Sequence, residues 1–114
     1  MSSPIGAPPG FLCRYTNALT LAAGVAQSFD VPVNGARDWV IAVSNTGANA
    51  ITAMTVASSP LGNLTEDATS VTSGIPIAAG STLAIRGQHE PVAMVRVTLT
   101  STSGTTASLE AGGW

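Results

Sequence analysis

The side chains that could carry out chemistry are few and lie far apart in the sequence. His89 is the only histidine of the chain, so a Ser-His-acid triad would have to use it. It stands in the run Gly-Gln-His-Glu-Pro, directly before an expected strand, where a solvated loop histidine is the simpler interpretation. His89 and Glu90 could form half of a metal site, but no further ligands follow at a recognisable spacing. We therefore expect no catalytic residue and no metal.

The other reactive residues carry equally weak signals. Glu66 and Asp67 lack the alternating oxygen ligands of a calcium-binding loop and are expected in a surface loop. Cys13, the only cysteine, would act as a nucleophile only beside a base and a positive field, so we expect a small buried apolar residue instead. No glycine-rich phosphate loop precedes a helix, because no helix is predicted anywhere. The sequence therefore predicts a protein that is not an enzyme and uses no cofactor.

Charged residues are scarce in this chain. Only 9% of the residues are charged, the net charge is −2, and the basic residues are four scattered arginines. A nucleic-acid-binding protein needs clustered cations to displace counterions from phosphates, so we exclude that class. Globular domains usually carry about 25% charged residues, and a surface with fewer charges is easier to bury against a neighbour. The composition therefore favours a subunit of an assembly.

The length of the chain indicates how many domains it has, and its lack of sorting signals indicates where the protein is expected to be made. A chain of 114 residues predicts one domain, and a single cysteine allows no disulfide within the chain. The segment 1–10 holds no basic stretch followed by an apolar one, so we expect no secretory signal. No apolar run approaches the ~20 residues that a membrane-spanning helix needs. We expect a protein made in a cytoplasm, without a membrane partner.

Alternating apolar and polar residues predict short strands along most of the chain. The clearest is 92–101, where Val95, Val97 and Leu99 face one way and the polar residues between them face the other. Glycine, proline and asparagine separate such runs, and no stretch shows apolar residues at helical spacing. The sequence therefore predicts an all-β fold, an antiparallel β-sandwich of the Ig-like or jelly-roll-like type with an extended N-terminal arm. Further predicted strands cover 18–21, 25–33, 38–44, 50–58, 75–77, 82–86 and 105–110.

The stretch 38–58 is expected to form a central β-hairpin around which the other strands are laid. Two β-rich runs flank the loop 45–49, which consists of turn-forming residues. In the first of these runs Trp39 alternates with aliphatic residues and is expected to face inward.

Three irregularities are expected within the strands. Pro32 cannot donate to a ladder, so its strand should lie at a sheet edge or end early. Asn34 and Gly35 form a good two-residue hairpin turn. Ile51 is one step out of phase with Met54, and a bulge between them would place both side chains inward.

The two ends of the chain are expected to lie outside the sandwich. We divide the chain into an extended proline- and glycine-rich arm (1–17), a β-sandwich domain (18–110) and a C-terminal tail (111–114). Three of the five aromatic residues stand at these ends, where a single molecule has least use for them. Either both ends fold back onto their own domain, or at least one crosses onto another subunit. The candidate interface residues are Pro8, Pro9, Phe11, Tyr15 and Trp114.

Several turns occur in an order that resembles a known group of proteins. They are the Asn45-Thr-Gly hairpin, the Ile75-Pro-Ile-Ala-Ala-Gly turn and the strand pair at 95–106, and the likeness covers about 24–109. This pattern resembles small β-sandwich structural proteins of tailed bacteriophages, notably capsid decoration (cement) proteins. The resemblance implies a trimer or dimer on the capsid surface of a virion, with the major capsid protein and copies of itself as partners. It implies no catalytic residues.

The sequence leaves two other functions open. A carbohydrate-binding or adhesion module usually needs exposed aromatic rings that stack on sugars, and Trp39 is the only such ring near a sheet face. Its alternation with Ile41 and Val43 points it inward, which weighs against this alternative. The chain could also be another virion component, such as part of a neck, tail or fibre.

Overall fold

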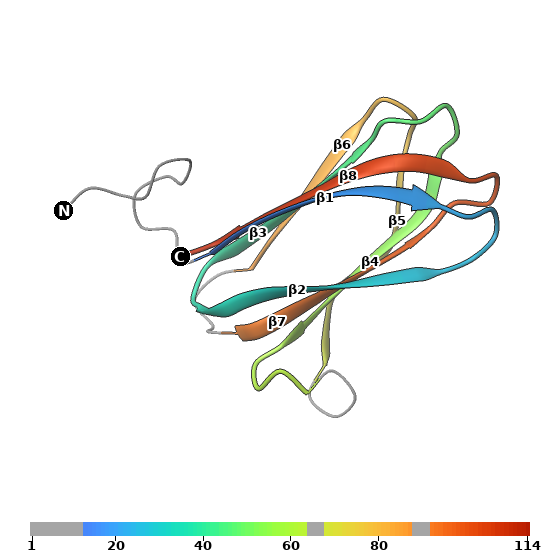
Figure 1. Ribbon diagram of the computed structural model, residues 1–114. Coiled ribbons are helices and arrows are strands. Elements are labelled where there is room, and N and C mark those ends of the chain that lie inside the picture. Colours follow the sequence, from blue (N-terminus) through green and yellow to red (C-terminus); the bar gives the residue numbers. More distant parts are fainter. Residues whose placement is uncertain (1–12, 64–67, 88–91) are drawn as a thin grey trace, which may run out of the picture.

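The computed structural model describes residues 13–63, 68–87 and 92–114, and this part of the chain consists of strands and loops without a helix (Figure 1). The all-β prediction is therefore confirmed for the described residues. The strands are β1 (Cys13–Leu21), β2 (Gln27–Ala36), β3 (Trp39–Asn45), β4 (Ile51–Ser59), β5 (Thr69–Ile77), β6 (Thr82–Gly87), β7 (Val92–Thr100) and β8 (Thr105–Gly113).

The strands form two four-stranded antiparallel sheets that pack face to face (Figure 1). One sheet has the order β1-β8-β3-β6 and the other the order β2-β7-β4-β5. The first strand thus pairs with the last, the second with the seventh, the third with the sixth and the fourth with the fifth. This is the pattern of one long hairpin rolled into a sandwich, which defines a jelly roll. Of the two predicted types of sandwich, the chain adopts the jelly roll.

The core lies between the sheets and consists of the side chains predicted to face inward. Trp39, Ile41 and Val43 are at most 2% exposed and alternate with half-buried residues along β3. The same alternation along β7 buries Val95 and Val97 completely. Each such aliphatic side chain stabilises the fold by about 1.5–3 kcal/mol through its removal from water. The period-two pattern therefore also accounts for the hydrophobic driving force of folding.

The predicted central hairpin is wrong, although both of its strands exist. β3 and β4 belong to different sheets, so the loop between them crosses from one layer to the other. The same holds for β7 and β8, which were expected to pair with each other. Turn-forming residues predict that the chain reverses, but they do not say whether the two strands pair or face each other across the core.

The expected hairpin at Asn34 and Gly35 is also wrong, because β2 continues through both residues to Ala36. The register against β7 shifts between Pro32 and Ala36, and Gly35 has a φ of 76°. A left-handed glycine at a register shift is typical of a β-bulge. Two other expectations are confirmed: β2 with Pro32 is an edge strand, and the register of β4 against β5 shifts between Ile51 and Met54.

The sandwich includes more of both chain ends than the range 18–110. β1 begins at Cys13, which pairs with Gly113 near the end of β8, so residues 13–17 and 111–113 lie in strands. β5 likewise begins at Thr69, six residues before the start of the predicted strand at 75–77. The predicted arm at 1–12 lies outside the described residues.

Candidate interaction surface

The described interface candidates are Tyr15 and Trp114, since Pro8, Pro9 and Phe11 lie outside the described residues. Tyr15 is half-buried in β1 and packs against the core, and its hydroxyl accepts a hydrogen bond from Asn17 Nδ2 at 3.3 Å.

Trp114 is held by its backbone against its own domain. Its N–H donates to the carbonyl of Asp38 at 2.8 Å, and its carbonyl accepts from the N–H groups of Arg37 and Asp38 at 3.2 and 3.1 Å. The residue remains 41% exposed. The backbone of this end therefore folds back onto the sandwich, while its surface stays accessible at the end where β1 begins.

The residues singled out for chemistry fall largely outside the described part of the chain. His89, Glu90, Glu66 and Asp67 all do, and Cys13 is the first residue of β1. Within 13–63, 68–87 and 92–114, no three His, Cys, Asp or Glu residues gather where they could hold a metal ion. The same residues contain no helix long and apolar enough to cross a membrane.

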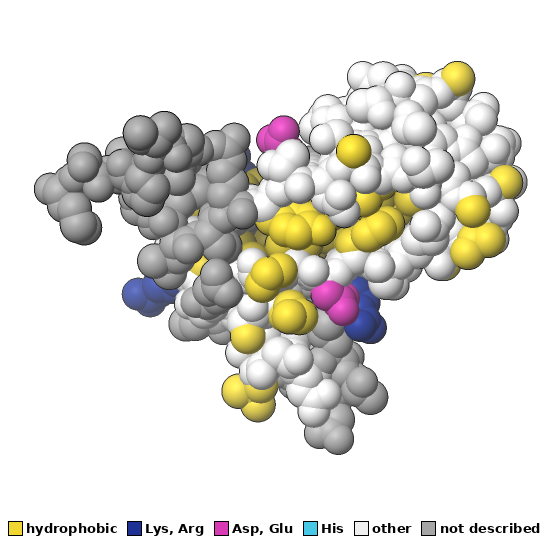
Figure 2. All heavy atoms as spheres, viewed as in Figure 1, with side chains coloured by type: hydrophobic (Ala, Val, Ile, Leu, Met, Phe, Trp, Pro, Cys, Tyr) yellow, Lys and Arg dark blue, Asp and Glu magenta, His cyan; other side chains and the backbone are white. Residues whose placement is uncertain are grey.

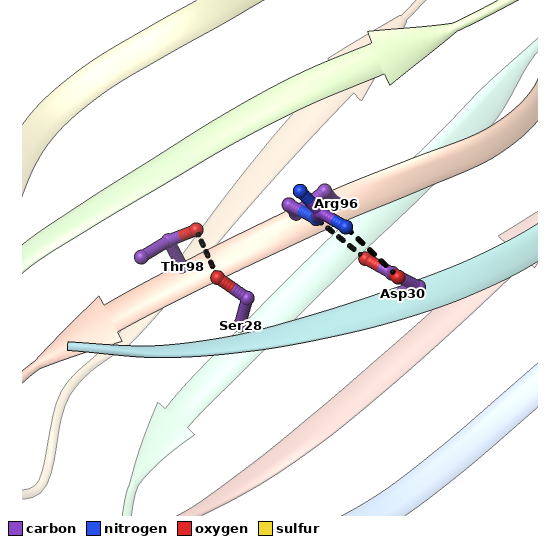
Figure 3. A network of polar contacts seen from close by, with 4 residues as sticks. All are labelled: Ser28, Asp30, Arg96 and Thr98. Atoms are coloured by element: carbon purple, nitrogen blue, oxygen red, sulfur yellow. Dashed lines mark hydrogen bonds and ion pairs between the residues drawn. The ribbon is translucent and has the colours of Figure 1, made fainter. Parts of the chain in front are cut away.

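One ion pair stands on the outer face of the β2–β7 ladder (Figure 3). Arg96 Nε and Nη2 donate to the two carboxylate oxygens of Asp30 at 2.7 and 3.2 Å, and both side chains are about 40% exposed. The hydrogen bond and the charge of Asp30 raise the pKa of the Arg96 guanidinium. Beside this pair, the hydroxyls of Ser28 and Thr98 lie 2.9 Å apart. These are cross-strand contacts that join β2 to β7 and leave no unpaired base or nucleophile.

The most distinctive surface is the end of the sandwich formed by four loops, which we call the loop end. It consists of 22–26, 46–50, 78–81 and 101–104, all of which are described, and these loops lie together at the right of Figure 1. They contain only Ala, Gly, Ser, Thr, Asn and Val. No charged residue and no aromatic residue occurs in them.

Hydrogen bonds join three of the four loops directly and tie the fourth to the end of β3. The Gly24 N–H donates to the Ser101 carbonyl at 2.9 Å, and the Ser101 hydroxyl donates to the Ala50 carbonyl at 2.7 Å. Asn49 Nδ2 donates to the Gly104 carbonyl at 2.8 Å. The Gly80 N–H donates to the Asn45 carbonyl at 2.9 Å, which links the remaining loop to the end of β3. Because each loop is bonded to another loop or to the end of a strand, the loop end forms one ordered surface.

Asn45, only 1% exposed, is the centre of this arrangement. Its Nδ2 donates to the carbonyls of Asn49 and Ile77 at 2.8 and 3.1 Å. Its Oδ1 accepts from the Gly47 N–H at 3.2 Å and from the Thr105 hydroxyl at 3.0 Å. A backbone N–H can only donate, so this contact fixes which side-chain atom is the oxygen. Asn45 thus ties β3, β5 and β8 together beneath the loops.

Gly47 lets the β3–β4 loop lie directly on β8. A Cβ at this position would collide with the Thr105 hydroxyl and would lie 2.7 Å from the Thr106 backbone nitrogen. The N–H groups of Thr46 and Gly47 instead donate to the Thr106 carbonyl at 3.0 and 3.1 Å. Glycine is required here for close approach.

Charged side chains lie away from the loop end. On the face that Figure 2 presents, the few dark blue and magenta atoms lie in the middle and at the left, while the right-hand end is white and yellow. The exposed Val25, at 51%, belongs to this end. The sequence patterns alone did not predict this surface, although four separate loops without charges are visible in the sequence. What joins them is the jelly-roll topology.

Comparisons with known proteins identify the architecture. No protein-family model matches the chain, and no curated protein matches it. PirA has a crystal structure similar to 97% of this chain and 100% of its own, with a TM-score of 0.58 at 10% sequence identity. A chitosan-binding module from a chitosanase/glucanase of Paenibacillus sp. IK-5 is similar over 82% of this chain and 74% of its own, with a TM-score of 0.59 at 18% identity.

A third structure, the SPBc2 prophage-derived protein YomS, is similar over 89% of this chain and 96% of its own, with a TM-score of 0.46 at 8% identity. The likeness to PirA and to the chitosan-binding module, at 10% and 18% identity, establishes a shared fold only. The chain is thus a small protein with a β-sandwich fold.

Proposed function

We propose that this protein is a non-enzymatic structural component of a virion, most specifically a capsid decoration protein. It binds the major capsid protein and copies of itself on the outer surface of the capsid. In this role it stabilises the lattice through many repeated contacts, and it needs neither a cofactor nor nucleic acid.

The observation that carries this proposal is the loop end, which combines freedom from charge with a network of hydrogen bonds. Burying a charged side chain at an interface costs desolvation energy, and these loops contain none. Ordering a mobile loop on binding costs conformational entropy, and each of these loops is already hydrogen-bonded to another loop or to the end of a strand. A surface of this kind suits a partner that is itself rigid and repeats many times.

Weak contacts are sufficient for such a subunit when several act together. Once one contact is formed, the next is made within the same particle, so the effective concentration is high. The scarcity of charge, 9% of residues, supports the same interpretation because more than one surface can be buried at small cost.

A carbohydrate-binding function is the second candidate, because the chitosan-binding module shares the fold. Trp39, the ring considered from the sequence, is 2% exposed and cannot stack on a sugar. The loop end offers no aromatic ring and no carboxylate. Trp114 is the described aromatic residue with the most exposed surface, so a glycan-array signal that Trp114→Ala abolishes would favour this second function over the first.

The test measures binding of the purified protein to capsids of its source virus that lack it. The variant Ala48→Glu/Ala79→Glu places two charges on the loop end, where both alanines are exposed. The control Ala68→Glu/Ala84→Glu makes the same changes at two exposed alanines outside the loop end. We expect the loop-end variant to lose at least about tenfold in capsid affinity, since each charge must be desolvated on docking.

The control should bind as the wild type does, and both variants should melt at the wild-type temperature. Equal binding by both variants would contradict a docking role for the loop end. No binding by the wild-type protein would contradict the decoration function itself.

A further inference from the structure

A β-sandwich of two open sheets has four edge strands, and three of those in this molecule are interrupted or short. β2 contains Pro32 and shifts register before Ala36. β5 shifts register three times against β4 and contains Pro76. β6 has only six residues. Proline, bulges and short length are the features by which proteins prevent unwanted pairing at an exposed edge.

The fourth edge strand, β1, has none of these features. All nine residues from Cys13 to Leu21 pair with β8 in unbroken antiparallel register. The strand contains no proline, glycine or lysine, and the segment 15–21 contains no charge. No strand of the described residues pairs with its outer side, since β1 stands at the end of its sheet. The outer side of β1 therefore presents backbone donors and acceptors in the arrangement that another strand needs.

Apolar side chains lie along the same edge. Figure 2 shows hydrophobic atoms in the seam between β1 and β2, where the two sheets are open at the side. Tyr15 on β1 and Phe29 on β2 are half-buried and pack against the core. A partner at this edge would cover the remaining surface of these rings in addition to pairing with the backbone.

We infer that β1 pairs with β1 of a second copy of the chain, in antiparallel orientation, so that two four-stranded sheets become one continuous sheet. The proposal rests on the proposed function only in that both require the protein to associate with itself. It adds the surface, the symmetry and the chemistry of that association: a two-fold axis and main-chain hydrogen bonds.

The residues of β1 are compatible with this self-pairing. A two-fold axis through Asn17, the middle residue of β1, overlaps the whole strand and places Thr16 opposite Ala18 of the second copy. Position 14 then stands opposite Thr20 of the second copy, so the axis places no two charged residues directly opposite each other within the strand pair.

The experiment compares two variants by sedimentation velocity across a wide range of protein concentration. Thr16→Lys/Ala18→Lys puts lysines on the exposed outer face of β1, where the proposed axis would bring those of the two copies together. Thr82→Lys/Ala84→Lys makes the same exchanges of the same residue types on the exposed face of β6, at the other edge of the same sheet.

We expect the wild type and the β6 variant to dimerise equally well and the β1 variant to dimerise at least about tenfold more weakly. In hydrogen exchange, amides of 15–20 should be slower in the dimeric wild type than in the β1 variant. Far-ultraviolet circular dichroism and melting curves establish that both variants fold.

Three results would overturn the proposal: a wild type that stays monomeric at the highest concentration, equal dimerisation of both variants, or selective loss in the β6 variant. These measurements need no capsid. The dimer can therefore fail while capsid binding succeeds, and capsid binding can fail while the dimer forms.

Discussion

Asn45 shows how one buried polar side chain can determine the course of a loop. Both hydrogens of its amide and both acceptor positions of its oxygen are used, by contacts to Asn49, Ile77, Gly47 and Thr105. A buried amide that lacked these partners would cost about 1–3 kcal/mol for each unpaired group. The side chain therefore favours the one loop path in which all four contacts form.

The first prediction is that Asn45→Asp lowers the free energy of unfolding by about 2–4 kcal/mol at pH 7, because a buried carboxylate would face the Asn49 and Ile77 carbonyls. The matched control is Asn49→Asp, since Asn49 is exposed and makes one side-chain bond, to Gly104. Asn49→Asp should lower the free energy of unfolding by less than about 1 kcal/mol. Urea unfolding measures both, and equal losses would contradict the central role of Asn45.

The pH dependence of Asn45→Asp follows from the same contacts. Burial and the two carbonyls favour the neutral carboxyl, so its pKa in the folded state rises above the unfolded value of about 3.9. An acidic group whose pKa is raised in the folded state destabilises the protein as pH increases through that range. The deficit in the unfolding free energy of Asn45→Asp relative to wild type should therefore be smallest near pH 3 and grow toward pH 7. A deficit independent of pH would show that the carboxyl is solvated.

Gly87 is a second position at which close packing determines the residue, because no side chain fits there. It pairs with Trp39 across β3 and β6, and a Cβ at Gly87 would overlap the indole ring. We expect Gly87→Ala to cost about 1–3 kcal/mol, the usual range for overpacking. In a Trp39→Phe background the added cost should shrink, since the smaller ring leaves room. A double-mutant cycle by urea unfolding measures this, and strictly additive effects would contradict the contact.

At the scale of elements, the alternation of apolar and polar residues along each strand determined which features of the fold could be predicted from the sequence. The period-two patterns around Ile41 and Val97 identify strands and their inward faces, because burial of one face imposes that pattern locally. The partner of each strand depends on residues far away in the chain. β3 pairs with β6 and β8, and no local signal at 45–50 or 101–104 distinguishes a crossing between layers from a hairpin.

The bulge in β2 illustrates the same limit. Asn34 and Gly35 form a good hairpin signal in isolation, yet β2 continues through them and takes up a positive φ at Gly35. The register against β7 shifts at this point, so the glycine serves the bulge and not a turn.

We predict that Gly35→Asn is tolerated better than Gly35→Val. Nothing lies within 4 Å of a Cβ at Gly35, so the cost is backbone strain alone. Asparagine enters the left-handed region readily, whereas a β-branched residue does so at a cost of about 1–3 kcal/mol. Thermal melting distinguishes the two, and equal melting temperatures would indicate that the bulge relaxes to a negative φ.

At the scale of the whole molecule, features that are weak individually point to assembly. The loop end carries no charge, β1 is an uninterrupted edge, and the exposed surface of Trp114 lies at the opposite end of the sandwich. The scarcity of charge and the position of aromatic residues near the chain ends can be read directly from the sequence. It could not predict that four separate loops meet, because the jelly-roll order brings them together.

The central claim is that the chain is a repeated structural subunit of a virion, and native mass spectrometry of the particle that contains it tests this most directly. The chain has a mass of 11.3 kDa, and we expect it to remain bound through purification in many identical copies, in a fixed ratio to the major capsid protein. Recovery of the chain only as a free 11.3 kDa monomer, with virions devoid of it, would contradict the account.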